Sequence, residues 1–142
     1  MKILFWGTPA FSVPSLEYLI SNGYDISAVI TQPDKKRGRG GSFICSPVKK
    51  KALEYGINVI TPINVSNDLS FYKHLQSIRY DISIVVAFGQ ILPKNILEHP
   101  KYGCWNCHAS LLPRWRGAAP IQWSILTGDT STGVGIMSME EG

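Results

Sequence analysis

One apolar run near the middle of the chain restricts the fold more than any other feature. In residues 81–88, which read Asp-Ile-Ser-Ile-Val-Val-Ala-Phe, only Asp81 and Ser83 are polar. A strand of a parallel sheet that is covered on both faces has such a run, whereas a half-exposed strand alternates apolar and polar side chains. The run is far too short to span a bilayer, which needs about 20 apolar residues. It therefore predicts a central strand of a parallel sheet.

Strand-like and helix-like segments alternate along the rest of this 142-residue chain, which the length prior makes one domain. Further strands are predicted over residues 2–6, 26–31, 58–60, 102–108 and 134–139. Helices are predicted over residues 12–22, 46–55, 68–77 and 120–126, with Ser12 and Ser46 as caps. Residues 32–45 are glycine-rich and are expected to form a long flexible loop. The alternation predicts an α/β fold, an open, mostly parallel, Rossmann-like sheet with helices on both faces.

Ligands of such sheets bind beyond the carboxyl ends of the strands, and several small or polar residues fall at those ends. They are Gly7, Gly89, Asn106 and His108. The turn after the first strand lacks a Gly-x-Gly-x-x-Gly pattern, and the chain has no Walker motif. A nicotinamide or nucleoside-triphosphate site is therefore not supported.

Positive charge gathers in one segment of a chain whose formal net charge is +4. Residues 34–51 contain half of the fourteen basic side chains and a single acid, Asp34. The basic residues are Lys35, Lys36, Arg37, Arg39, Lys49, Lys50 and Lys51. The ordinary interpretation of such a run is a solvated surface. The functional interpretation is a surface that binds the phosphates of a nucleic acid.

Two of the three cysteines lie in a Cys-x-x-Cys-His pattern, Cys104 to His108, which formally matches haem attachment, a redox pair or half of a zinc site. In a strand the two thiols would point to opposite faces and could not form a Cys-x-x-Cys redox loop. Cys45 is the only other cysteine, and the short apolar run at the N-terminus does not resemble a signal peptide. We therefore expect two small buried apolar side chains, with no haem and no metal.

Asn106 and His108 form the most suggestive pair of polar residues. If residues 102–108 are a strand, both side chains point to the same face, because side chains alternate with a period of two. An amide donor beside an imidazole suits acyl transfer through an oxyanionic intermediate. The alternative is an Asn and a His that bond only locally at a strand end.

A longer stretch, residues 106–122, resembles the signature of the folate-dependent formyltransferases. It reads Asn-Cys-His-Ala-Ser-Leu-Leu-Pro-Arg-Trp-Arg-Gly-Ala-Ala-Pro-Ile-Gln. Shorter segments resemble the same family in the same order, at residues 5–11, 31–34, 38–40, 46–49, 87–93 and 133–137. The strongest resemblance is to the branch that formylates methionyl initiator tRNA, the methionyl-tRNA formyltransferases, and it runs from residue 1 to residue 142.

This resemblance implies a reaction and a role for each matching residue. Members of the family move a formyl group from 10-formyltetrahydrofolate to an amine. Asn106 matches the donor to the oxyanion, and His108 matches the histidine that stabilises the intermediate and helps to move protons. The residues that match the folate contacts are Gln90, Ile91, Leu92, Ser110, Leu111, Leu112 and Pro113. Those that match the loop by which the family reaches the tRNA acceptor stem are Lys35, Lys36, Arg37, Arg39 and Lys49.

The family pattern continues past Gly142 to a catalytic aspartate in Leu-Asp-x-Gly-Asp. Residues 1–142 are therefore expected to form an incomplete formyltransferase catalytic domain, without the C-terminal tRNA-binding domain, and to be a poor catalyst alone. Two alternatives stay open: formylation of another amine, such as an amino sugar or a purine precursor, and a non-catalytic folate- or tRNA-binding remnant. A cytoplasmic protein that does not bind membranes, and a monomer, are the default expectations.

Overall fold

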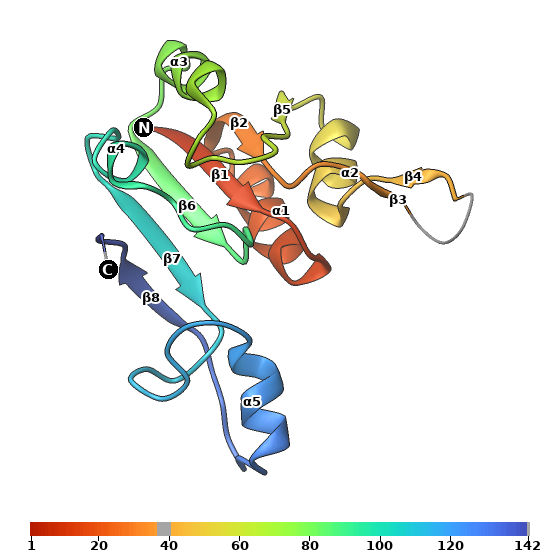
Figure 1. The fold of residues 1–142 in the computed structure, drawn as a ribbon, viewed down its shortest axis with the longest axis vertical. Coiled ribbons are helices and arrows are strands. Elements are labelled where there is room, and N and C mark those ends of the chain that lie inside the picture. Colours follow the sequence, from red (N-terminus) through yellow and green to blue (C-terminus); the bar gives the residue numbers. More distant parts are fainter. Residues whose placement is uncertain (37–40, 142) are drawn as a thin grey trace.

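The apolar run at residues 81–88 forms β6 (Ile82–Val86), an inner strand of a six-stranded sheet in the computed structural model, which describes residues 1–36 and 41–141 (Figure 1). The strand order is β5-β2-β1-β6-β7-β8. The other strands are β1 (Lys2–Gly7), β2 (Asp25–Ile30), β5 (Val59–Ile60), β7 (Cys104–His108) and β8 (Gly135–Ser138). All neighbouring pairs are parallel except β7 and β8. The prediction of an open, mostly parallel sheet is confirmed.

Helices cover both faces of this sheet, as predicted. α1 (Val13–Ser21) and α2 (Pro47–Glu54) pack on one face, where Leu16 and Val48 meet Phe5 of β1. α3 (Leu69–Ser77) and α4 (Lys94–Leu97) pack on the other, where Phe71 and Ile96 join a core with Trp6. Phe5 and Trp6 are neighbours in one strand, so their side chains point to opposite faces. The sheet therefore separates two apolar cores.

Serine and aspartate caps start two of these helices, and one expected cap is wrong. The Oγ atom of Ser46 accepts a hydrogen bond from Lys49 N at 2.9 Å, and an Asp68 oxygen accepts one from Phe71 N at 2.9 Å. Ser12 was expected to cap α1 in the same way, but its Oγ donates to the carbonyl of Val86 at 2.6 Å. The buried Ser12 therefore joins the 3₁₀ turn η1 (Ala10–Ser12) to the end of β6.

The structure departs locally from the predicted elements in three further places. The residues 32–45 expected to be a flexible loop contain a short antiparallel pair, β3 (Lys35–Lys36) and β4 (Phe43–Ile44). β6 ends at Val86, before the predicted Phe88, because Ala87 adopts a left-handed backbone with a φ of 47°. The four-residue α4 follows Pro93, which starts it without a side-chain cap, so no polar capping signal marks it in the sequence.

α5 (Pro120–Leu126) agrees with its predicted bounds and lies beyond the end of β7, away from the helices that cover the sheet (Figure 1). Among the described residues, none of the helices is long and apolar enough to cross a membrane.

Candidate functional site

A pocket of about 710 Å³ opens where β7 ends. The polar side chains of Asn106 and His108 line it together, as the period-two alternation of a strand predicts. Its other lining residues are Leu112, Pro113, Arg116, Gly117 and Met137. The volume lies within the range of about 300–1,000 Å³ that is usual for small-molecule sites. Apolar walls with a few converging polar groups are the usual composition of such sites.

The loop that follows β7 holds the imidazole of His108. Its Nε2 atom lies 2.9 Å from the carbonyl oxygen of Trp115. Because a carbonyl oxygen can only accept, the hydrogen of this bond belongs to Nε2. In the neutral ring Nδ1 then keeps its lone pair and is the nitrogen that can take up a proton. The backbone of Trp115 is itself left-handed, with a φ of 56°.

A second group of contacts fixes Trp115. Its indole N–H donates to Asp129 at 2.6 Å, and Asp129 also accepts two hydrogen bonds from Arg114, at 2.8 and 2.6 Å. The indole ring stacks on Trp123 of α5 with 5.9 Å between ring centroids. The Arg114 guanidinium, followed by the Trp115 indole, holds the pKa of the Asp129 carboxyl well below its usual range. Asp129 and Arg114 therefore pin the loop that bonds His108.

The predicted folate contacts at residues 110–113 are divided between three places. Leu112 and Pro113 line the main pocket, whereas Leu111 lines a smaller hollow of about 200 Å³ beside Asp129. Ser110 is buried, and its hydroxyl donates to the carbonyl of Arg114 within the same turn. These four residues belong to one loop, and only Leu112 and Pro113 line the pocket of Asn106.

Residues 90–92 follow β6 and do not line either pocket. The amide of Gln90 accepts a hydrogen bond from Val65 N and donates to the carbonyls of Pro62 and Ile63. Ile91 is almost fully exposed, and Leu92 is buried in the core. Because β6 and β7 are parallel neighbours, this segment still leaves the sheet at the same edge as Asn106. Its folate contact stays a prediction.

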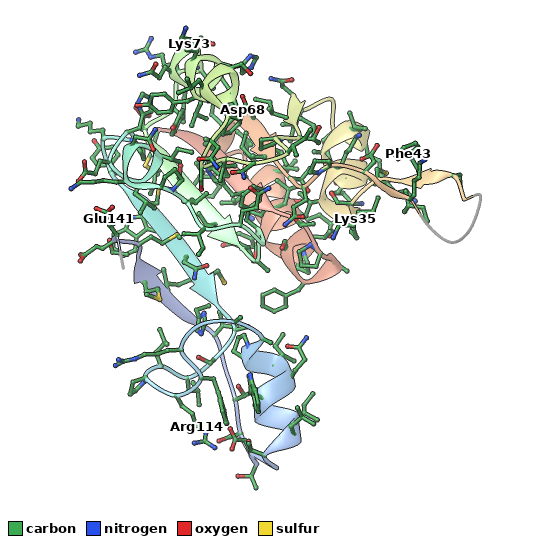
Figure 2. The ribbon with its side chains drawn as sticks, viewed as in Figure 1. Lys35, Phe43, Asp68, Lys73, Arg114 and Glu141 are labelled. Atoms are coloured by element: carbon green, nitrogen blue, oxygen red, sulfur yellow. The ribbon has the colours of Figure 1, made fainter. Side chains whose placement is uncertain are left out.

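Two of the predicted tRNA-contacting residues, Lys35 and Lys36, lie at a second place, the β3–β4 hairpin, by which we mean the paired residues 35–36 and 43–44. Lys35 and Lys36 are exposed there, and Lys36 Nζ lies 5.5 Å from the ring centroid of the exposed Phe43. Figure 2 shows Lys35 and Phe43 on this hairpin, far from Arg114 in the loop after β7. Arg37 and Arg39 lie outside the described residues. Lys49 lies on α2, where it is ion-paired with Asp34.

The two cysteines of β7 point to opposite faces of the sheet as expected, but only Cys104 is fully buried, and Cys107 is half-buried. Cys104 belongs to the core on one face, and Cys107 packs against the core on the other. Burial raises the pKa of both thiols. Within residues 1–36 and 41–141, no group of three or more His, Cys, Asp or Glu side chains could hold a metal ion.

The sequence analysis did not predict three of the residues that line the pocket: Arg116, Gly117 and Met137. Met137 lies directly opposite Asn106 in the antiparallel register of β7 and β8. Only the pairing of these two strands could have revealed it. Arg116 stands two positions from Arg114, but the sequence could not show which arginine is paired. The structure pairs Arg114 with Asp129 and places Arg116 at the pocket.

The mostly parallel sheet carries an amide, an imidazole and apolar walls at the end of β7, an arrangement that suits acyl transfer. The sequence profile of a family described as formyl transferase matches residues 1–142, and the chain belongs to that family.

Two relatives show where in the family the likeness is strong. The chain is 59% identical over its whole length to the methionyl-tRNA formyltransferase of a strain of Prochlorococcus marinus. It is 61% identical, again over its whole length, to that of Synechococcus sp. (strain WH7803). It spans only 42% of the length of each of these two proteins.

A solved structure supports the fold alone. A phosphoribosylglycinamide formyltransferase from Bacillus halodurans superposes with a TM-score of 0.78 at 17% identity, covering 100% of this chain and 73% of the other.

Proposed function

We propose that the protein transfers a formyl group from 10-formyltetrahydrofolate to the amino group of methionyl initiator tRNA. The observation that carries the proposal is the identity of 59% and 61%, over all 142 residues, to two proteins named methionyl-tRNA formyltransferase. We also propose that it acts in the cytoplasm as a monomer, during translation initiation.

The pocket at the end of β7 suits the reacting centre. Transfer of an acyl group to an amine develops negative charge on the acyl oxygen. Asn106 carries an amide N–H that can donate to this oxygen, and His108 can accept at Nδ1 the proton that the attacking amine loses. The proton is then returned to the nitrogen that leaves. Both side chains line the same pocket, so one substrate pose can meet both.

The lining of the pocket also fits the formyl donor, which supplies the one-carbon group when it is bound. Leu112, Pro113 and Met137 provide apolar contacts suited to a ring system. Our proposal adds the backbone of residues 90–92, the neighbouring loop at the same edge of the sheet. Ser110 serves this site by shaping the turn, because its hydroxyl is used on the carbonyl of Arg114.

The β3–β4 hairpin is proposed to meet the tRNA. Lys35 and Lys36 can neutralise phosphates, which provides affinity and register more than sequence readout. The exposed ring of Phe43 lies beside Lys36, and an aromatic ring next to a cation suits an unpaired base and its backbone. Arg37 and Arg39 belong to the same proposal. An acceptor amine on a small molecule would not need such a hairpin.

A formylation assay with three acceptors tests the proposal. Methionyl initiator tRNA, glycinamide ribonucleotide and an amino sugar nucleotide would each be offered with 10-formyltetrahydrofolate. Because residues 1–142 are expected to be a poor catalyst alone, we expect slow formyl transfer, to the tRNA only, at a rate that falls further when Lys35 and Lys36 are both changed to Ala. Transfer to either small amine in preference to the tRNA would contradict the proposed acceptor. If the protein bound folate and tRNA but catalysed no transfer at all, the alternative of a non-catalytic binding remnant would be favoured.

A further inference from the structure

Two side-chain pairs close the base of the β3–β4 hairpin. Lys49 Nζ donates to both carboxylate oxygens of Asp34, at 2.8 and 2.7 Å. The hydroxyls of Thr31 and Ser46 lie 2.7 Å apart. Thr31 and Asp34 precede the hairpin and Ser46 and Lys49 follow it, so each pair joins the incoming chain to the outgoing chain.

We call the pairs Asp34–Lys49 and Thr31–Ser46 the clasp. Both sides of the clasp are attached to well-packed parts of the molecule. Thr31 directly follows β2 and is fully buried. Ser46 caps α2 and Lys49 lies in its first turn, next to Val48, which is buried against the sheet. A hairpin that is closed at such a base can be held at a fixed angle to the sheet.

The carboxylate of Asp34 already compensates the charge of Lys49 in this arrangement. The side chains of Lys49 and Asp34 are only 24% and 30% exposed, and the lysine contacts both oxygens of one carboxylate. Lys35 and Lys36, by contrast, are exposed, and no ion pair involves them within the part of the chain that the structure describes. Because Asp34 already compensates its charge, Lys49 should attract a phosphate less strongly than Lys35 and Lys36.

We infer that Asp34 and Lys49 are a positioning pair, which sets the angle at which the β3–β4 hairpin meets the tRNA, and that Lys49 does not contact a phosphate. The inference rests on the proposed function, because it needs the hairpin to bind the nucleic acid. The sequence analysis expected Lys49 to contact the tRNA, and the inference gives Lys49 a positioning role instead.

A double-mutant cycle tests the inference by measuring the affinity of the protein for methionyl initiator tRNA between about 50 and 200 mM salt. The variants are Asp34→Asn, Lys49→Met, the two together, and the exchange Asp34→Lys with Lys49→Asp. We expect each single change to weaken binding by about fivefold, the usual upper value for one ion pair. The double variant should be no weaker than either single variant, and the exchange should restore the affinity.

The salt dependence separates positioning from phosphate contact. Loss of a phosphate contact reduces the slope of log affinity against log salt by about 0.7 to 0.9. We expect this reduction in Lys35→Ala but not in Lys49→Met. Lys50→Met is the matched control for the loss of one charge on α2, because Lys50 is exposed beside Lys49. It should change neither the affinity nor the slope beyond the measurement error.

Two results would overturn the inference: a shallower salt slope in Lys49→Met, or tighter binding in Asp34→Asn, in which a phosphate-binding lysine would be set free. An unsubstituted protein that does not bind the tRNA would instead contradict the proposed function. The clasp is then judged by ¹⁵N heteronuclear NOE values at Lys35 and Phe43. These should fall in both single variants and recover in the exchange, and unchanged values would refute the clasp.

Discussion

Asn106 is the residue on which the proposed chemistry depends most directly. If its amide donates to the developing oxyanion, Asn106→Ala should lower kcat by about 10²- to 10³-fold, the usual loss for one such donor. KM for either substrate should change little, because the bond strengthens only as the charge develops. Steady-state kinetics with both substrates varied would test this. A variant that raises KM and keeps kcat would show that Asn106 only binds the substrate.

Asp129 acts at the same scale, but through the loop that bonds His108. Its carboxyl pKa is lowered in the folded protein from an unfolded value of about 3.9, so its stabilising effect is complete above that value. The effect is lost as the pH falls through the lower folded pKa. We therefore expect the stack of Trp115 on Trp123 to loosen at acidic pH, from about pH 4 downward.

Near-ultraviolet circular dichroism of the stacked indoles would follow this change. Asp129→Asn should weaken the signal at neutral pH and remove its acid transition. Asp25→Asn is the matched control, because Asp25 forms only an exposed pair with Lys2, at 3.9 Å. An acid transition that survives in Asp129→Asn would show that another group causes it.

At the scale of the elements, the loop that follows β6 depends on a glycine. Gly89 has a φ of 91°, and a Cβ atom there would lie 2.5 Å from Gln32 Nε2, which donates to the carbonyl of Phe88. Gly103 has a similar φ of 70°, but a Cβ atom there would meet nothing within 4 Å. Gly103→Ala should therefore lose about 1–2 kcal/mol of unfolding free energy from backbone strain alone.

Gly89→Ala should lose about 1 kcal/mol more, because Gln32 must move and give up its hydrogen bond. Urea unfolding of the two variants would provide the comparison. Equal losses would mean that the backbone angle, and not the contact with Gln32, decides the effect.

The elements also show how far the sequence alone could lead. The unbroken apolar run predicted β6 as an inner strand, and strand alternation predicted that Cys104 and Cys107 face different cores. These features depend only on spacing along one segment. The bond from His108 to Trp115 and the pair of Arg114 with Asp129 could not be predicted. They depend on the path of the loop after β7, which includes left-handed backbone at Trp115, where no glycine or asparagine signals it.

At the scale of the whole molecule, one edge of the sheet exposes apolar side chains. β8 is an edge strand, and Ile136 within it is 68% exposed. Outside this strand, Val134 is 54% exposed, and Ile125 and Leu126 of α5 are 73% and 75% exposed. Apolar side chains along an unpaired edge favour pairing with another chain. We therefore expect residues 1–142 to associate as their concentration rises, although a monomer is the default at low concentration.

Sedimentation velocity of the chain and of Ile136→Lys would test this expectation. A charged side chain on an edge strand discourages pairing, so the variant should stay near 15.7 kDa at concentrations where the unsubstituted chain associates. Leu69→Lys is the matched control, because Leu69 is 77% exposed but begins α3, away from the sheet edge. If Leu69→Lys were as effective as Ile136→Lys, general surface charge would explain the result. An unsubstituted chain that stays monomeric throughout would contradict the expected association.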